Sequence, residues 1–582
     1  MKKTIIAIVL ILAAGGAAAY YFLAGPSTSP ATPDNYAAIV PADTLFYTGA
    51  SQPNEFADVL SGLQRENLES MRADMESYRK AAPRYGQAGL FLEGLLEVYS
   101  ERAAQGKPVP GVSRTRQSVM YSVGIVPVLR VQLADAAAFA QFIDEAEQRG
   151  GAQSAKGSYQ GVDYREYSIQ VNNEPVPASL LVAVRPDFVV VTFDVPKLRD
   201  ESLPLALGLK TPAQSLAQSG MIERIAEKHG FASSGLGFIN HQAIVAALTG
   251  APDSRAASML TELDTNQKLA SLREPGCRQD LQSIAEVWPI TVMGVLPADG
   301  AGPDEVAVRE RLVSRLTDPS LTATLSKLRG HIPSALLDGS QESMLGFALG
   351  LDVSSLAPVV SDLQQRFLQA DFQCDWLIQA QQDVRQKNPA AATIAAAMIS
   401  GVRGVSLSVF GFDPTPAAGM TRGIDALVNI SATNPEMLFE MAKRMKPKLL
   451  GNVQIPSDGS SVVLVPGQGS SEVRAMIAGQ HLLLFTGEQA AKVARNLGGN
   501  ELKPNGLVYY RVDYGKLMPV LAKMMSRNKG ATGEDADKLQ AVQKSLRRMA
   551  QSKLRLRMSL DVGEPGIIVD MKAAAAEPSP GS

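Results

Sequence analysis

The feature that most constrains the fold is a series of segments that recur in the same order along the chain. The copies lie roughly 265 to 297 positions apart. Four pairs match: 183–191 with 477–484, 129–150 with 426–445, 235–248 with 506–521, and 290–312 with 554–573. Repeats of this length indicate a supersecondary unit that is used more than once. Chance similarity between strand–helix patterns is the alternative, and duplication with insertions explains the shared order better.

Each half of the chain has the same predicted plan. The plan is a strand, a long helical insert (54–85 or 354–386), a strand, a helix, a hairpin, a helix, a strand, a helix and a closing hairpin. Asp135 and Asn434 precede the matched helices 136–150 and 435–445, where their side chains suit the N-cap. Hairpins joined by helices predict an α+β fold, with a mostly antiparallel sheet in each half that helices cover.

The N-terminus predicts a membrane anchor. Lys2 and Lys3 precede an apolar run at 5–24, and 20 helical residues would span roughly 30 Å, which is the thickness of a bilayer core. The run ends in an aromatic group at 20–22, which is typical of a spanning helix that ends at the membrane interface. A cleaved signal peptide is the alternative. Both interpretations export the body, and the lysines place an uncleaved N-terminus in the cytoplasm.

These segments define the predicted domain organisation. It is a cytoplasmic stub 1–4, a transmembrane anchor 5–24, a flexible linker 25–35, a first α+β repeat 36–328, a second repeat 329–573, and a disordered tail 574–582. The linker is rich in Pro, Ser and Thr and cannot pack a core.

Cys277 and Cys374 are the two cysteines of the chain. In an exported protein an even pair predicts a disulfide. Two separately buried thiols are the alternative, because free cysteine packs as a small hydrophobe. Two cysteines and four scattered histidines do not have the spacing of metal ligands, so we expect no metal site.

Composition excludes several functions. Lys and Arg total 56 against 58 Asp and Glu, so no basic field for nucleic acid is expected. The 45% apolar content is too high for a disordered chain. No nucleophile elbow, zinc-protease motif, Walker loop or dinucleotide fingerprint is present, and we expect no cofactor and no catalysis.

Several residues are candidates for a site, but each has a structural explanation. His229, His241, His331 and His481 could each be catalytic, but His481 reads as a strand residue and His229 as a helix C-terminus. Ser526 and Lys529 have the S-x-x-K spacing of a serine nucleophile with a lysine, but the segment is predicted to be a loop. The acidic turn 297–305 is also predicted to be a loop. Met437, Met441 and Met445 recur at helical spacing, which favours a buried core face over a flexible docking surface.

The segment VPADTLFYTGA, beginning at Val40, is similar to the opening of an uncharacterised family of membrane-anchored bacterial envelope proteins. In that family a Pro-Ala-Asp-Thr-Leu strand begins a duplicated α+β body. The resemblance covers Val40 to Gly49 and implies an envelope location with the body in the periplasm. It transfers no functional residues.

The sequence thus predicts a bitopic inner-membrane protein whose periplasmic body is a binding or scaffolding module without catalytic activity. Its expected partners are the membrane, through residues 5–24, and an envelope protein or an apolar ligand. The alternative function is a periplasmic carrier or chaperone for a lipid or other apolar ligand, which predicts a large apolar cavity. A third is a hydrolase with an unrecognised site.

Overall fold

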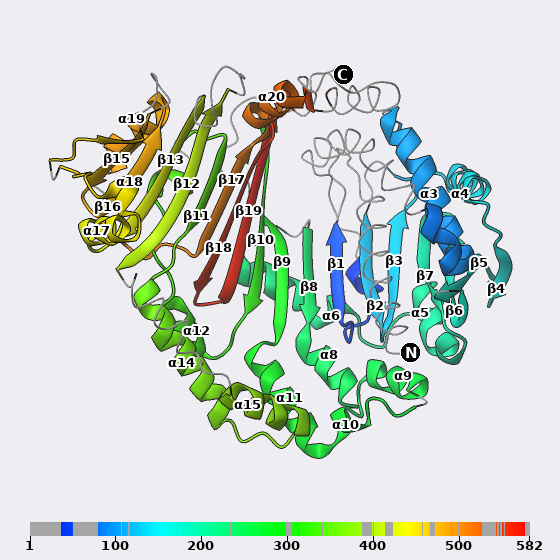
Figure 1. Cartoon of the computed structure of the whole chain (residues 1–582). Helices are drawn as coiled ribbons and strands as arrows, with labels where there is room; N and C mark the ends of the chain where they lie inside the picture. Colours follow the sequence, from blue (N-terminus) through cyan, green and yellow to red (C-terminus); the bar gives the residue numbers. More distant parts are fainter. Residues whose placement is uncertain are drawn as a thin grey trace. The chain divides into compact units, whose positions relative to one another are not determined.

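The structure is a computed structural model of the whole chain (Figure 1). It describes residues 36–50, 79–105, 107–113, 117–171, 173–232, 235–264, 266–297, 305–338, 341–386, 399, 401–413, 423–456, 458–465, 472–497, 501–525, 543, 546–547, 550–551 and 553–576. The predicted anchor 5–24, most of the helical insert 54–85 and the Ser526–Lys529 segment lie outside these residues. Among the described residues, no helix has the length and apolar character needed to cross a membrane.

The described residues form two compact units. Unit 1 runs to Val308 and unit 2 from Arg309 to Ala576. The sequence placed the junction of the two repeats at residue 329. The structural boundary lies earlier because the strand β10 (Glu305–Arg315) pairs with the strand β19 (Gly566–Ala576) near the end of unit 2.

Unit 1 contains an antiparallel sheet. Its strands are β1 (Phe46–Ala50), β2 (Ser118–Val123), β3 (Val126–Gln132), β4 (Ala155–Tyr159), β5 (Val162–Val171), β6 (Glu174–Val184), β7 (Phe188–Asp194), β8 (Gly235–Asn240) and β9 (Ile290–Leu296). They pair in the order β4-β5-β6-β7-β3-β2-β1-β8-β9. The predicted hairpin over 183–191 is confirmed as β6 and β7.

Helices follow most of these strands. They are η1 (Tyr36–Ala38), η2 (Ala82–Tyr85), α3 (Gly86–Ala104), α4 (Ala136–Gly150), η3 (Pro196–Leu198), α5 (Arg199–Ala206), α6 (Leu216–Ser219), α7 (Met221–His229), α8 (His241–Leu248), α9 (Arg255–Leu263), α10 (Ala270–Arg273) and α11 (Pro275–Val287). The predicted N-cap of α4 is confirmed, because Asp135 Oδ1 accepts a hydrogen bond from the backbone N–H of Ala138 at 2.9 Å.

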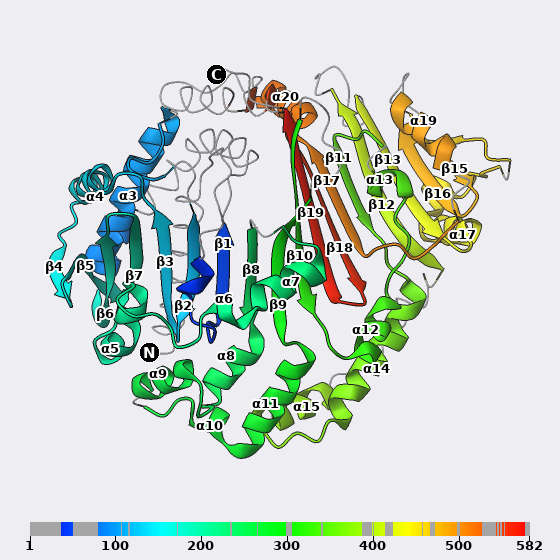
Figure 2. The same cartoon turned by 180° about the vertical axis from the view of Figure 1, so that it is seen from behind.

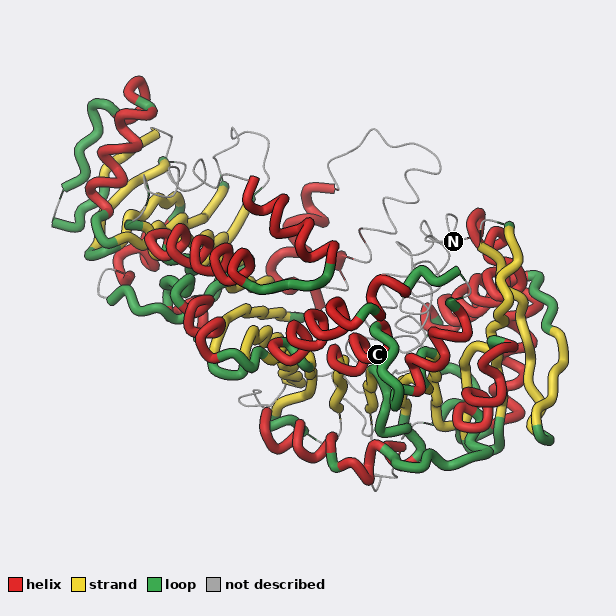
Figure 3. The backbone as a smooth tube through the Cα atoms, turned by 90° about the horizontal axis from the view of Figure 1, so that it is seen from below, coloured by secondary structure: helices red, strands yellow, loops and turns green. Residues whose placement is uncertain are grey.

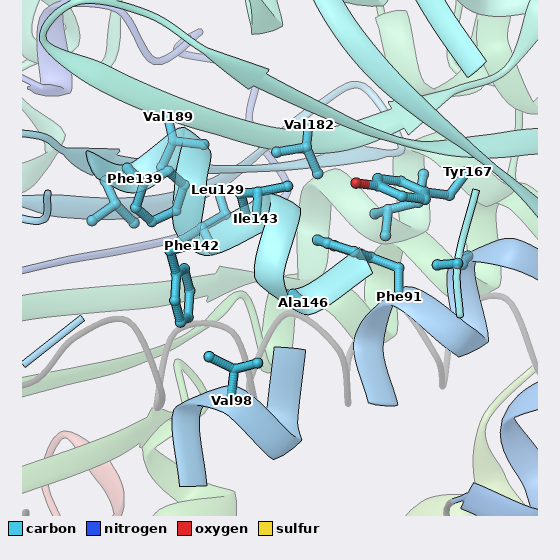
Figure 4. Packing of buried hydrophobic residues seen from close by; sticks show 14 of the residues in the cluster. Phe91, Val98, Leu129, Phe139, Phe142, Ile143, Ala146, Tyr167, Val182 and Val189 are labelled. Atoms are coloured by element: carbon cyan, nitrogen blue, oxygen red, sulfur yellow. The ribbon is translucent and has the colours of Figure 1, made fainter. Parts of the chain in front are cut away.

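A hydrophobic core of unit 1 lies where α3 and α4 pack on one face of β3 and β5–β7. Phe139 and Ile143 of α4 lie beside Leu129 of β3, whereas Phe142 points toward Val98 of α3 (Figure 4). Phe91 of α3 stacks on Tyr167 of β5, with ring centroids 4.1 Å apart. These side chains are almost fully buried, so the core stabilises the outer strands of the unit.

The close approach of α3 and α4 depends on two glycines. A Cβ atom on Gly94 would lie 2.0 Å from the carbonyl oxygen of Ala146, and one on Gly150 would lie 2.0 Å from that of Leu90. We therefore expect Gly94→Ala to lower the free energy of unfolding by about 1–3 kcal/mol, even though alanine favours a helix. Thermal unfolding followed by circular dichroism measures this. Gly411→Ala, where no atom lies within 4 Å of the new Cβ, is the control; equal effects of the two changes would contradict the packing argument.

Unit 2 is also built on antiparallel strands (Figure 2). Besides β10 and β19, its strands are β11 (Leu345–Leu349), β12 (Val402–Phe412), β13 (Ile424–Ala432), β14 (Val462–Val465), β15 (Val473–Ala478), β16 (His481–Thr486), β17 (Val508–Asp513) and β18 (Arg555–Gly563). They pair in the order β10-β19-β18-β17-β11-β12-β13-β16-β15-β14.

The helices of unit 2 cover parts of both faces of this sheet. They are α12 (Pro319–Ser326), α13 (Ser334–Leu337), α14 (Val353–Gln369), α15 (Asp375–Gln386), α17 (Pro435–Met445), α18 (Pro447–Leu450), α19 (Glu488–Leu497) and α20 (Tyr514–Met525). Leu483 packs in a cluster with α19, whereas the adjacent Leu482 packs with Phe439 of α17, so these two helices lie on opposite faces. The predicted N-cap of α17 is confirmed: Asn434 accepts from the N–H of Met437 at 2.9 Å.

The predicted α+β class with antiparallel strands is confirmed in both units, and Figure 3 shows helices and strands in each. The hairpin predicted over 554–573 is β18 and β19, and the one predicted over 477–484 is formed by the end of β15 and by β16. Most of the acidic turn 297–305 lies outside the described residues.

Candidate functional site

The most unusual surface of unit 2 is an apolar sheet face, which we name the apolar face. Six large side chains on it are each 37–44% exposed: Phe347 and Leu349 of β11, Val405 and Leu407 of β12, Met558 of β18 and Met571 of β19. Strand register places them together. Phe347 pairs with both Leu407 and Tyr510, Tyr510 pairs with Met558, and Met558 pairs with Met571. The result is an uninterrupted apolar row across five strands.

The apolar face carries no charged side chain on β11, on β12 between Val405 and Val409, and on β17–β19. Between the exposed residues lie half-buried Leu345, Val409, Val508, Tyr510, Leu560 and Val569, which the register places on the same face. Exposed apolar patches of this kind mark sites of protein, membrane or ligand contact.

The opposite side of the sheet carries buried polar side chains on β12, β13, β16 and β17, and we name this part the polar face. Ser406 and Ser408 of β12, Asn429 and Ser431 of β13, and His481 of β16 are all below 5% exposed. Along β12, serine therefore points into the protein while Val405 and Leu407 point out. Antiparallel sheets ordinarily place apolar residues inside and polar residues outside, so this strand is inverted.

Hydrogen bonds explain how the polar face tolerates burial. Asn429 Nδ2 donates to Ser431 Oγ at 3.2 Å, and Ser431 Oγ lies 3.0 Å from His481 Nδ1. Gln341 Nε2 donates to Ser408 Oγ at 2.6 Å. Buried polar groups with partners cost little, and the network holds the small residues of this face in a fixed arrangement.

The polar face also contains one buried arginine. Arg511 of β17 is 2% exposed and donates through a terminal guanidinium nitrogen to the carbonyl oxygen of Gln341. Its cross-strand neighbour Gly346 leaves room for the side chain. Burial, and then the positive charges of Arg557 and Arg555, lower the pKa of Arg511 from its usual value.

The four histidines occupy structural positions. His229 ends α7 before Gly230, which has a left-handed conformation, and His481 begins β16, as the sequence predicted. His241 Nε2 lies 2.9 Å from Thr291 Oγ1, and the ring packs 4.4 Å from that of Trp288. His331 is buried, with its ring 5.7 Å from that of His481. Ser431 and His481 form the kind of pair that a nucleophilic site requires, but both are fully buried, so a substrate could not reach them.

Burial of His331 makes unfolding sensitive to pH. Burial lowers the pKa of His331, and the carbonyl oxygen of Lys503 opposes this only in part. The unfolded chain has the usual value near 6.5, so it takes up a proton first as the pH falls. This stabilisation is therefore complete above about pH 6.5 and is lost as the pH falls toward the lower folded-state value, by up to about 1.4 kcal/mol per pH unit.

The check is a series of melting temperatures at pH 7.5, 6.5 and 5.5. The wild-type melting temperature should fall across the series, and His331→Gln should reduce the slope. Burial also lowers the pKa of His241, so part of the slope should remain. The double change His241→Gln with His331→Gln should reduce the slope further than His331→Gln alone. A slope that is the same in the wild type and in His331→Gln would contradict the assignment.

Cys277 and Cys374 are both disulfide-bonded, and the structure contains no free cysteine. Cys277 lies on α11 and Cys374 directly precedes α15; both are buried. As these are the two cysteines of the chain, the predicted pairing is confirmed.

The row of methionines at 437, 441 and 445 (the methionine stripe) does not face the core, which corrects the interpretation from the sequence. Met437 of α17 is 48% exposed and Met445 is 72% exposed, so the stripe does not form a core face. Pro435 and Phe439 are the buried residues of this helix instead. The helical spacing correctly placed the three methionines on one face of α17. The face that packs on β16, however, is the one that carries Phe439.

The described residues contain a cavity in unit 1, but it is not the large apolar cavity expected for a carrier. Its volume is about 260 Å³, and its lining includes Asp200, Glu201, Lys210 and Arg255. Arg255 pairs with Asp43 at 3.2 Å, and Asp200 accepts from the hydroxyl of Tyr159 at 3.1 Å. Within the described ranges, no group of three or more His, Cys, Asp or Glu side chains is arranged to hold a metal ion.

The residues of the apolar face were not among those singled out from the sequence. The signal was present in β12, where Val405, Leu407 and Val409 alternate with Ser406 and Ser408. Alternation shows that two faces differ but not which of them faces the core, and the usual rule assigns the apolar face to the core.

No protein-family model, no curated protein and no solved structure matches the chain. The class of protein is therefore defined by its own fold, an α+β body built on antiparallel strands, and by the apolar face.

Proposed function

We propose that the chain is a binding protein of the bacterial envelope that holds an apolar ligand against the apolar face. The observation that carries the proposal is the exposure of Phe347 and Leu349 on β11 and of Val405 and Leu407 on the inverted strand β12, while the residues between them are buried. The largest apolar patch on a protein surface is often functional, so a binding role is a physical reason for keeping this row exposed.

The available area sets the strength of binding. Taking about 150–200 Å² for a large apolar side chain, the six exposed fractions sum to on the order of 400 Å². Covering this area would contribute roughly 10 kcal/mol at about 25 cal/mol per Å². Association costs about 4–15 kcal/mol, so the net affinity is modest and the ligand can exchange. This suits a carrier or chaperone better than permanent storage.

We also propose that the body is one α+β unit used twice. The strand orders support this: β1–β3 and β5–β9 of unit 1 correspond to β11–β18 of unit 2, with β4 as an addition. Asn240 and Asp513, at corresponding strand ends, each accept from a backbone N–H at the start of the next helix. Unit 1 carries Phe238 stacked on Tyr47 where unit 2 carries Arg511 beside Gly346, so the copies differ at this point.

The proposed location is the periplasmic side of the inner membrane, with residues 5–24 as the anchor. The disulfide supports an oxidising compartment outside the cytoplasm, because such bonds are rare in the reducing cytosol.

Photo-crosslinking in intact cells tests the binding function. The full chain with Phe347→p-benzoylphenylalanine is irradiated, and the mass added to the peptide that contains β11 is measured. We expect a lipid-sized adduct. Leu449→p-benzoylphenylalanine is the control, because Leu449 is an exposed apolar residue of α18 in the same unit. An adduct to another protein at position 347, or equal lipid labelling at both positions, would overturn the proposal.

A scaffolding function remains the second candidate because of one observation. Met437 and Met445 of α17 are exposed on one helix, and methionine surfaces adapt to varied apolar partners. Crosslinks from Met445→p-benzoylphenylalanine to one reproducible envelope protein would support this function, and their absence would count against it.

A further inference from the structure

The edge of the apolar face carries one carboxylate, Glu310 of β10. Its neighbours Arg309 and Arg311 both reach Asp570 of β19, at 3.7 Å and 2.6 Å. Successive residues of a strand point to opposite faces, so Glu310 points away from Asp570. On β19 the residues that alternate with Asp570 are Val569 and Met571. Glu310 therefore lies on the same side of the sheet as Met571, at the end of the apolar row.

Glu310 has no hydrogen bond and no ion pair within the part of the chain that the structure describes. The nearest arginines in sequence are committed to Asp570, and Arg311 binds it through two nitrogens, at 2.6 Å and 2.8 Å. More than a third of the Glu310 side chain is exposed, yet the surrounding protein withholds enough water to raise the pKa of the carboxyl group. A carboxylate in such surroundings is stabilised by a cation or a hydrogen-bond donor.

The dimensions of the apolar face suit one hydrocarbon chain. The row from Met571 to Leu407 crosses four strand spacings, or about 19 Å at about 4.8 Å each. One leaflet of a bilayer, half of the roughly 30 Å core, gives about 15 Å for an acyl chain. Beyond β12 the same face is closed, because α17 packs there on Ile430 and Leu482. The row is thus closed at its β13 end and has the carboxylate of Glu310 beside Met571 at its other end.

The area argues for a small occupant and against a second copy of the chain. The exposed side chains offer on the order of 400 Å², and a stable protein–protein interface needs about 800 Å² from each partner. A second copy would also bring a second unpaired Glu310 to the interface instead of a cation.

We propose that the ligand is a long-chain amphiphile with an ammonium head group, whose hydrocarbon chain lies across β19, β18, β17, β11 and β12 and whose head group binds Glu310. This inference rests on the proposed function and adds the chemical class of the ligand. Charge complementarity selects the head group, and the length of the row selects a single extended chain.

Three photoactivatable probes test the proposal. Each has a 16-carbon chain with a diazirine near its middle, and they differ only in an ammonium, hydroxyl or carboxylate head group. Membranes that contain the full chain are labelled with each probe, and adducts on peptides from β12, β18 and β19 are counted by mass spectrometry. We expect the ammonium probe to label these peptides at least threefold more than the carboxylate probe.

Two variants of equal charge separate the head-group contact from general electrostatics. Glu310→Gln should remove the preference for the ammonium probe, whereas Glu564→Gln should keep it. Glu564 is an exposed carboxylate in the turn between β18 and β19. If the probes label the apolar face equally, or if Glu310→Gln keeps the preference, the role of Glu310 is overturned while the proposed function stands. If no probe labels these peptides, both are overturned.

Discussion

Replacing Cys277 and Cys374 together by serine is expected to lower the free energy of unfolding by about 4–5 kcal/mol. The two cysteines are 97 positions apart, and in the chain-entropy model a crosslink that closes a loop of this length restricts the unfolded chain by about this amount. Both side chains are almost fully buried, so the change to a polar hydroxyl adds a smaller cost in the folded state. Thermal unfolding monitored by circular dichroism gives the loss as a fall in melting temperature.

Reduction of the wild-type protein provides the matched comparison, because it opens the crosslink without changing any side-chain volume. The reduced wild type and the double variant should melt at similar temperatures, both below the oxidised protein. Titration of thiols in the unfolded, unreduced wild type should find none. Two free thiols, or a melting temperature that does not respond to reduction, would show that the cysteines are not paired in solution and would remove one support for an exported body.

Local features were predictable from the sequence because their causes are local. Asp135 and Asn434 were identified as helix caps, since an N-cap depends on one side chain and the backbone N–H groups that follow it. The hairpin β6–β7 was identified from two apolar runs and a short turn, and the pairing of Val184 with Val189 confirms it. In each case the decisive residues lie within a few positions of one another.

The direction in which an element faces was not predictable, because it depends on residues far away in the sequence. Periodicity showed that Met437, Met441 and Met445 share one face of α17, but Phe439 and its partners on β15 and β16 decide which face is buried. For the same reason, the alternation in β12 did not reveal that its apolar residues face outward. The role of Glu310 was hidden for a related reason, since it follows from the binding of Arg309 and Arg311 to Asp570, which is 259 residues from Arg311.

Adjacent substitutions on β12 test the inversion directly. Ser408→Leu is expected to lower the free energy of unfolding by about 2–5 kcal/mol. Ser408 is 2% exposed, accepts from Gln341 and lies opposite Gly346 and Leu427, so a larger side chain overpacks the site and leaves the amide of Gln341 without its acceptor. Leu407→Ser, one residue earlier, should change stability by no more than about 0.5 kcal/mol, because Leu407 is on the exposed face.

The usual rule for antiparallel strands predicts the reverse ranking, with the loss of leucine costly and the loss of serine harmless. Melting temperatures of the two variants therefore decide between the two orientations of β12. Ser408→Ala serves as the control, because it removes the hydroxyl without adding volume and so separates the lost hydrogen bond from overpacking. Leu407→Ser should also abolish lipid labelling at the apolar face while the fold persists. If Leu407→Ser unfolds the protein, the leucine belongs to a core, and the binding function loses the observation on which it rests.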